Sequence, residues 1–127
     1  MAEGSTTYAD GLDDLVLSTN ADYEEAFDIV EVEQGEDDEP FDLTNCTARM
    51  QLRVTPSDSR AYLDLNSEPG GGISLNVTEG SIAIRAPASS MALVPPGTLV
   101  RDILLFRGDD VIYAGRGSVT VLKGITR

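Results

Sequence analysis

Histidine and tryptophan are missing from this sequence, and cysteine and lysine each occur only once. Without histidine, the chain lacks the side chain that most often acts as a general base, as the partner of a nucleophilic serine or cysteine, or as a zinc ligand. Carboxylate and lysine chemistry remain, and the single lysine is Lys123. The lone Cys46 cannot form an internal disulfide, and we interpret it as a small core residue.

Long apolar runs are also missing. No stretch of about 18 or more apolar residues occurs, so we expect no membrane-spanning helix and no membrane partner. The first residues, MAEGSTTYADGLDDL, have neither the basic start nor the apolar core of a secretory signal, so we expect the chain to stay in the cytoplasm in which it is made. A length of 127 residues with 41% hydrophobic content fits one domain with its own core.

Basic residues are missing from the first third of the chain. Residues 1–40 hold 14 of the 22 acidic residues and no lysine or arginine, whereas residues 41–127 hold eight acids and nine bases. The net charge of -13 therefore belongs to the first third. Such a segment would repel phosphate groups, so we expect no nucleic acid partner. A basic protein partner, or simply a solvated surface, fits this charge.

From Leu15 onward, short apolar runs alternate with clusters of Gly, Pro, Asn and Asp, which is typical of an all-β domain. The segment PFDLTNCTARMQLRV, Pro40–Val54, shows the strand period most clearly, because apolar and polar side chains alternate along it. The predicted strands are Leu15–Ser18, Glu25–Val32, Cys46–Val54, Ala61–Leu65, Ile73–Val77, Ser81–Arg85, Leu99–Phe106, Val111–Gly115 and Ser118–Leu122. We expect residues 1–13 to form an extended acidic N-terminal arm and residues 14–127 to form the domain.

The segments between these strands carry turn signals. Glu79-Gly80 and the stretch from Arg107 to Asp110 predict tight hairpins, and SEPGGGI, residues 67–73, predicts a flexible reversal. PASSMALVP, residues 87–95, could form a helical turn with Pro87 at its first position and Ser89 or Ser90 as a cap.

Strands with one apolar face must bury that face against another layer. We therefore predict a two-layer antiparallel β-sandwich, immunoglobulin-like in size, with a partly closed small barrel as the alternative. Arg49 and Arg53 fall on the outer face, where their stems cover the sheet and their charges stay in water. The predicted core consists of Phe27, Ile29, Cys46, Ala48, Met50, Leu52, Leu63, Leu65, Ile73, Leu75, Ile82, Ile84, Ile103, Leu105, Val111, Tyr113, Val119 and Val121.

Two acidic patterns could carry chemistry. QGEDDEP, residues 34–40, clusters carboxylates as calcium ligands do, but it lacks the spacing of a calcium loop and reads better as a solvated connection. Asp64 and Asp102 could form a carboxylate pair for glycoside hydrolysis, yet alternation puts both on polar faces, and for Asp102 an ion pair with an arginine of a neighbouring strand is the simpler role. We therefore predict a protein that is not an enzyme and has no catalytic residues, metal or cofactor.

The segments PFDLTNCTARMQLR, AYLDLNSEPGGGISL, EGSIAIRAPASSMALVPPGTLVRDILLF and DDVIYAGRGSVTVLKGITR together resemble small β-sandwich proteins encoded among the tail and neck genes of tailed bacteriophages. The N-terminal domain of the baseplate upper proteins of lactococcal phages is similar in this pattern. The resemblance covers Pro40 to Arg127, and the sequence departs from it at Asn45, where glycine is usual, at Arg101, where tyrosine is usual, and at Ile125, which replaces valine.

This resemblance implies a virion structural protein, made in the cytoplasm of the host bacterium, that binds tail, neck, portal or baseplate proteins and forms a symmetric ring of identical subunits. A head decoration, or cement, protein that clamps capsid subunits is the alternative. A carbohydrate-binding module is disfavoured, because the chain has no tryptophan and its four tyrosines are scattered. We expect the acidic arm of one subunit, with Asp10, Asp13 and Asp14, to lie against Arg49 and Arg53 of another.

Overall fold

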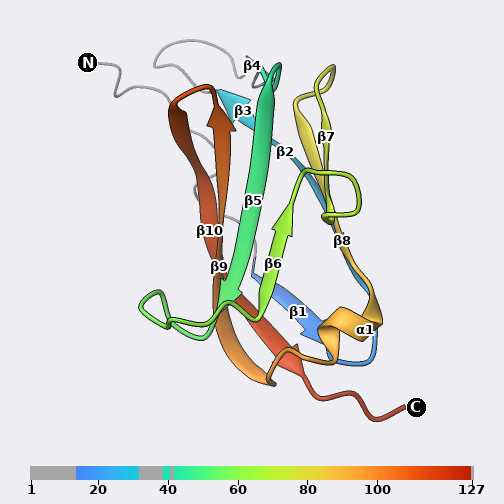
Figure 1. Ribbon diagram of the computed structural model, residues 1–127. Coiled ribbons are helices and arrows are strands. Elements are labelled where there is room, and N and C mark those ends of the chain that lie inside the picture. The colour runs from blue at the N-terminus through green and yellow to red at the C-terminus, as the bar shows by residue number, and fades with distance from the viewer. Residues whose placement is uncertain (1–13, 32–38, 41, 127) are drawn as a thin grey trace.

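A computed structural model of the chain describes residues 14–31, 39–40 and 42–126. Ten strands and one short helix follow one another along this part of the chain (Figure 1). Their bounds are β1 Leu15–Ser18, β2 Tyr23–Asp28, β3 Val30–Glu31, β4 Glu39–Pro40, β5 Cys46–Arg53, β6 Leu63–Asn66, β7 Ile73–Asn76, β8 Ser81–Ala86, α1 Ala88–Met91, β9 Gly97–Arg107 and β10 Asp110–Leu122. The prediction of an all-β chain is confirmed.

The strands form two main sheets, one of five strands in the order β1-β10-β9-β5-β6 and one of three in the order β2-β8-β7, beside a two-residue pairing of β3 with β4. The two sheets lie face to face with the apolar core between them, as a sandwich requires (Figure 1). One feature of the prediction is wrong, because β1 pairs with β10 in parallel, with Leu15 beside Val119. The turn after β1 leads into the other sheet, so β1 has no sequence neighbour to pair with and adds to the last strand instead.

Alternation along the central strands sets the core. Every second residue is buried from Ala48 to Leu52 in β5 and from Leu99 to Leu105 in β9, and Met50, Leu52, Ile103 and Leu105 face the second sheet. The buried hydrophobic residues are Tyr23, Ile29, Leu43, Ala48, Met50, Leu52, Leu63, Leu65, Ile73, Ile82, Ile84, Ala86, Met91, Val94, Leu99, Ile103, Leu105, Ala114, Val119 and Val121. Most of the predicted core is confirmed, although Phe27, Cys46 and Leu75 are only half-buried at its margin.

The prediction that Val111 and Tyr113 belong to the core is wrong, because their exposed fractions are 61% and 42%. The two predicted strands at this place form one strand, β10, whose register against β9 shifts between Tyr113 and Gly115. Such a bulge inserts one extra residue and reverses which side chains face inward. Ala114 turns into the core, and Val119 and Val121 follow on the inner face.

Two other boundaries differ from the prediction. The strand predicted to run from Glu25 to Val32 ends at Asp28, and the buried Ile29 leaves it, with its N–H donating to the Gly80 carbonyl at 2.8 Å. The helical turn is present as α1, but Pro87 is the extended residue before it, and the prediction of Ser89 or Ser90 as the cap is wrong. The acceptor comes from a distant segment instead: the Asp22 carboxylate accepts the Ala88 N–H at 2.8 Å.

The predicted hairpins after β7 and β9 are confirmed, since β7 pairs with β8 and β9 with β10 in antiparallel fashion. Gly80 has the positive φ of 68° that the tight β7–β8 turn requires. The SEPGGG reversal is held in place by hydrogen bonds: Asn66 Oδ1 accepts the Glu68 N–H at 2.9 Å, and the Asn66 N–H donates to the Gly71 carbonyl at 2.9 Å. This fixes a loop beside the three-stranded sheet.

One charged side chain lies inside the core and links the two sheets. Arg101 of β9 has no exposed side-chain surface and forms an ion pair with Glu25 of β2, whose side chain is 14% exposed. It also donates to the Tyr23 hydroxyl at 2.8 Å, and that hydroxyl donates to Glu25 at 2.8 Å. Burial raises the pKa of Tyr23 well above its ordinary value. Burial alone would lower the pKa of Arg101, but its hydrogen bonds to Glu25 and Tyr23 raise that pKa above the ordinary value.

Candidate interaction surfaces

The outer face of the five-stranded sheet carries the two arginines that the sequence singled out. Arg49 on β5 binds Asp64 on the neighbouring β6 with two hydrogen bonds, from Nε to Oδ1 at 3.0 Å and from Nη2 to Oδ2 at 2.7 Å. The hydrogen bonds from Arg49 lower the pKa of Asp64. Both side chains are largely exposed, so the pair contributes little to stability, but the charge of Arg49 is balanced within its own chain.

Among the described residues, Arg53 has no carboxylate as a direct hydrogen-bond partner, although its charge helps to lower the pKa of the nearby Asp64. Its guanidinium donates to the Asp58 backbone carbonyl and to Gln51 Oε1, both at 2.7 Å, and these acceptors are neutral. Gln51 in turn donates to Asp64 Oδ2 at 3.0 Å, so hydrogen bonds join the two arginines into one network. The side chain of Arg53 is thereby held on the face with its positive charge still available to a partner.

Arg116 on β10 adds a third cation to this face, which the sequence did not single out. A hollow of about 230 Å³ lies between Arg116 on one side and Arg53 and Gln51 on the other, with Val100 and Leu104 among its lining residues. Asp102 also lines the hollow, opposite Arg116 in the strand register. Arg116 is exposed and makes no hydrogen bond or ion pair within the described part of the chain. We call Arg49, Arg53 and Arg116 the arginine face.

The structure describes only one of the three acidic residues that we predicted to meet this face. Asp10 and Asp13 lie outside the described residues. Asp14 is exposed and directly precedes β1, at the edge of the same sheet. Two strands, β10 and β9, separate β1 from the strand of Arg53, which is roughly 15 Å of sheet. Asp14 therefore does not pair with the predicted arginines of its own chain.

Of the other acidic candidates, the structure describes Asp64 and Asp102. Residues 32–38, with most of the possible calcium loop, lie outside the described residues. Asp64 and Asp102 flank Gln51 in the register, so a whole strand separates their backbones. Within residues 14–31, 39–40 and 42–126, no group of three or more acidic or cysteine side chains is arranged to hold a metal ion.

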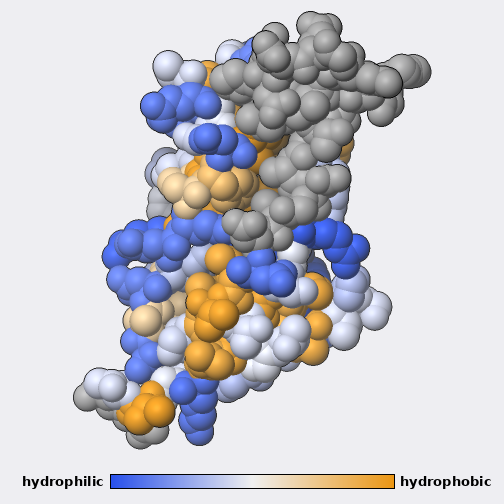
Figure 2. Space-filling model, turned by 180° about the vertical axis from the view of Figure 1, so that it is seen from behind, coloured by the Kyte–Doolittle hydropathy of each residue, from blue (hydrophilic) through white to orange (hydrophobic). Residues whose placement is uncertain are grey.

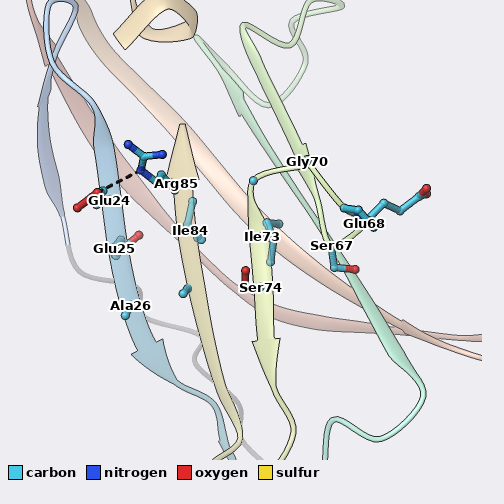
Figure 3. Close-up of a pocket in the computed structure, with 13 residues that line it drawn as sticks. Glu24, Glu25, Ala26, Ser67, Glu68, Gly70, Ile73, Ser74, Ile84 and Arg85 are labelled. Carbon is cyan, nitrogen blue, oxygen red and sulfur yellow. Dashed lines mark hydrogen bonds and ion pairs between the residues drawn. The ribbon is translucent and has the colours of Figure 1, made fainter. Parts of the chain in front are cut away.

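The three-stranded sheet carries a larger groove of about 750 Å³ on its outer face (Figure 3). Ala26, Ala83 and Ser74 stand side by side across the three strands and leave a shallow floor. The loop from Ser67 to Gly72 forms one wall. Sequence reasoning missed this groove, because its small residues lie far apart in the chain and meet only through the strand register.

Charges on this groove are opposite in sign to those of the arginine face. Arg85 binds two acids at once, Glu24 at 3.2 Å, which Figure 3 shows, and Asp22 at 3.1 Å. Glu68 adds a further carboxylate at the wall, and its side chain makes no hydrogen bond or ion pair with the described residues. Glu24 and Glu68 therefore line the groove beside the single guanidinium of Arg85, and Asp22 binds that guanidinium from outside the lining.

Exposed apolar side chains gather elsewhere. Figure 2 shows an apolar region in the lower half of the rear view, on the side where Figure 1 places β1 and the end of β10. Val16 on β1 and Leu122 at the end of β10 are 68% and 53% exposed, and Ile125 beyond β10 is 91% exposed. In the described part of the chain, no helix is long and apolar enough to cross a membrane.

Comparison with known proteins gives no family for this chain. No protein-family model matches the sequence, and no curated protein matches it significantly. The function is therefore argued from the surfaces described above and from the sequence resemblance.

Proposed function

We propose that the protein is a non-enzymatic structural component of a tailed-bacteriophage virion, placed in the tail, neck or baseplate, which assembles through contacts between subunits. The two-sheet architecture and the strand pattern from Pro40 onward support this proposal, together with the resemblance that they carry. In this proposal the sandwich is immunoglobulin-like, and residues 1–13 are its extended acidic arm. Its partners are identical subunits in a ring and adjoining tail, neck, portal or baseplate proteins.

The observation that carries the proposal is the arginine face. Arg53 and Arg116 line one hollow, and within the described residues neither guanidinium forms a hydrogen bond or ion pair with a carboxylate. With Asp102 in the same hollow, the three charges sum to a net positive site. The first 40 residues of the chain hold 14 acids and no base, so an identical subunit supplies a matching negative segment. Such contacts select orientation and partner more than they add affinity.

Asp10, Asp13 and Asp14 of one subunit are the acids assigned to this contact. Asp14 directly precedes β1 at the far edge of its own sheet, and two strands separate β1 from the strand of Arg53 in the same chain. An acidic segment that binds the hollow of a neighbour uses different surfaces on the two partners. Contacts of that kind build rings when the rotation closes.

A copy count in purified particles tests the place in the virion. We expect mass spectrometry to find the protein at about six or twelve copies per particle, as virion symmetry gives for neck and tail rings. Hundreds of copies would instead indicate the cement role on the head. Absence of the protein from purified particles would overturn the proposal.

Variants of the contact test its chemistry. We expect the double change Arg53→Glu with Arg116→Glu, and separately a deletion of residues 1–13, to reduce incorporation into particles. The matched control is Arg60→Glu, since Arg60 lies in the β5–β6 loop, over the Tyr62 ring at 4.6 Å. Unchanged incorporation of both variants would refute the arm contact.

A further inference from the structure

The groove on the three-stranded sheet has the properties of a binding site for a basic, apolar segment. Its volume of about 750 Å³ falls within the roughly 300–1,000 Å³ of ligand-binding pockets. The floor of Ala26, Ala83 and Ser74 consists of small side chains and leaves room for a larger apolar one. The surrounding carboxylates exceed the single guanidinium, so a positively charged occupant is favoured over a negative one.

The chain itself contains a segment of that kind directly after β10. We call Lys123–Thr126 the exit segment. Ile125 has the highest exposed fraction, 91%, among the large hydrophobic side chains of the described residues. Lys123 is exposed and makes no hydrogen bond or ion pair with the described residues. An exposed cation two residues from an exposed isoleucine matches both the charge and the floor of the groove.

The exit segment is presented outward by two hydrogen bonds. The Gly124 N–H donates to Thr19 Oγ1, and Asn20 Nδ2 donates to the Thr126 carbonyl, both at 2.9 Å. These contacts tie its backbone to the turn between β1 and β2 and leave the Ile125 side chain in solvent. None of the residues that line the groove belongs to the exit segment of the same chain.

We propose that the groove of one copy binds the exit segment of a second copy, with Ile125 on the floor between Ala26 and Ser74 and Lys123 beside Glu68. Each copy then offers one groove and one exit segment, and this head-to-tail contact repeats from subunit to subunit. The proposal rests on the proposed function only in taking the partner to be an identical subunit. It uses none of the residues of the arginine face.

Self-association of the full chain tests the proposal. We expect sedimentation velocity to show concentration-dependent association of the wild type. Ile125→Asp removes the apolar side chain, and Ala83→Arg fills the floor and repels Lys123. Each is expected to weaken association by about tenfold or more, because burial of a large apolar side chain contributes at least that factor. Both positions are exposed, so folding is expected to be unaffected.

A charge exchange and a matched control make the test specific. Glu68→Lys and Lys123→Glu are each expected to weaken association, and their combination is expected to restore it, since the pair is then rebuilt with reversed signs. The control Ala92→Arg makes the same change as Ala83→Arg at an exposed position outside the groove, and it is expected to have no effect.

The outcomes separate this contact from the arm contact. Loss of association in the groove variants with retention in Arg53→Glu/Arg116→Glu supports the groove proposal, whatever the outcome in particles. A wild-type chain that remains monomeric up to about 1 mM overturns it, because a contact weaker than that is not specific assembly. Association that persists in Ile125→Asp and Ala83→Arg overturns it as well, and so does a charge-exchanged double variant that fails to associate.

Discussion

The buried ion pair between Arg101 and Glu25 predicts a large loss of stability when only one partner is removed. Their side chains are 0% and 14% exposed, so solvent screens their attraction little. In Arg101→Met, the Glu25 carboxylate and the Tyr23 hydroxyl lose their donor while they still face the core. Removal of one member of such a pair costs about 3–5 kcal/mol. A domain of this size is typically stable by only roughly 5–15 kcal/mol.

Urea denaturation followed by circular dichroism measures this cost. With a slope of about 1–3 kcal/mol per molar urea, a loss of about 4 kcal/mol lowers the midpoint by roughly 1–4 M. The double variant Arg101→Met/Glu25→Leu leaves no buried charge. We expect it to recover most of the loss, apart from about 1 kcal/mol for the Tyr23 hydroxyl, which then keeps only the weak acceptor Met50 Sδ.

The control for this experiment is Arg85→Met, which removes an exposed arginine with two acidic partners. It is expected to cost less than about 1 kcal/mol. The reasoning is refuted if Arg101→Met unfolds within about 1 kcal/mol of the wild type, or if the double variant is no more stable than Arg101→Met alone.

Three further predictions concern acid stability, the loop beside the groove and the helix cap. The pKa of Asp64 in the folded chain lies below the ordinary value of 3.8, so its stabilisation is complete above that pH and is lost as the pH falls through the folded pKa. The urea midpoint is measured at one pH above 3.8 and at one pH below it. We expect the midpoint to fall less between these two pH values in Asp64→Asn than in the wild type, and an equal fall in both proteins would contradict this prediction. Gly72→Ala is expected to lower the thermal midpoint by the equivalent of about 1–3 kcal/mol, because the φ of Gly72 is +97° and the new Cβ would lie 2.8 Å from the Arg85 carbonyl oxygen. An unchanged thermal midpoint would show that the loop adapts to the new side chain. Asp22→Ala is expected to lower the free energy of unfolding by about 1 kcal/mol, because the Ala88 N–H loses its acceptor. Asp22→Asn keeps an acceptor, so we expect a smaller loss of stability in the same urea denaturation assay.

Local alternation predicts a strand well only while its pairing is regular. The inner and outer faces of β5 follow directly from the period of two between Cys46 and Arg53. The same rule fails on β10, because the bulge near Ala114 depends on how this strand pairs with β9. The cap of α1 fails for a similar reason, since its acceptor, Asp22, lies 66 residues earlier in the chain.

The candidate surfaces show the same division between local and distant information. The outward direction of Arg49 and Arg53 follows from alternation, whereas their acceptors on β6 and in the β5–β6 loop depend on the fold. Sequence reasoning missed the buried Arg101, although alternation with Leu99 and Ile103 is a signal that could have placed it on the inner face. Its partner, Glu25, lies in the other sheet. A local sequence pattern cannot predict this pairing, because the pairing depends on how the two sheets stack.

The parallel pairing of β1 with β10 joins residues about a hundred positions apart, as Leu15 and Val119 illustrate. On a ribosome that adds roughly 5–20 residues per second, β1 therefore waits on the order of 5–20 s for its neighbour to be made. During that interval the exposed Val16 and the unpaired edge of β1 are available to other nascent chains. A chaperone that shields this strand during translation would raise the yield of folded protein.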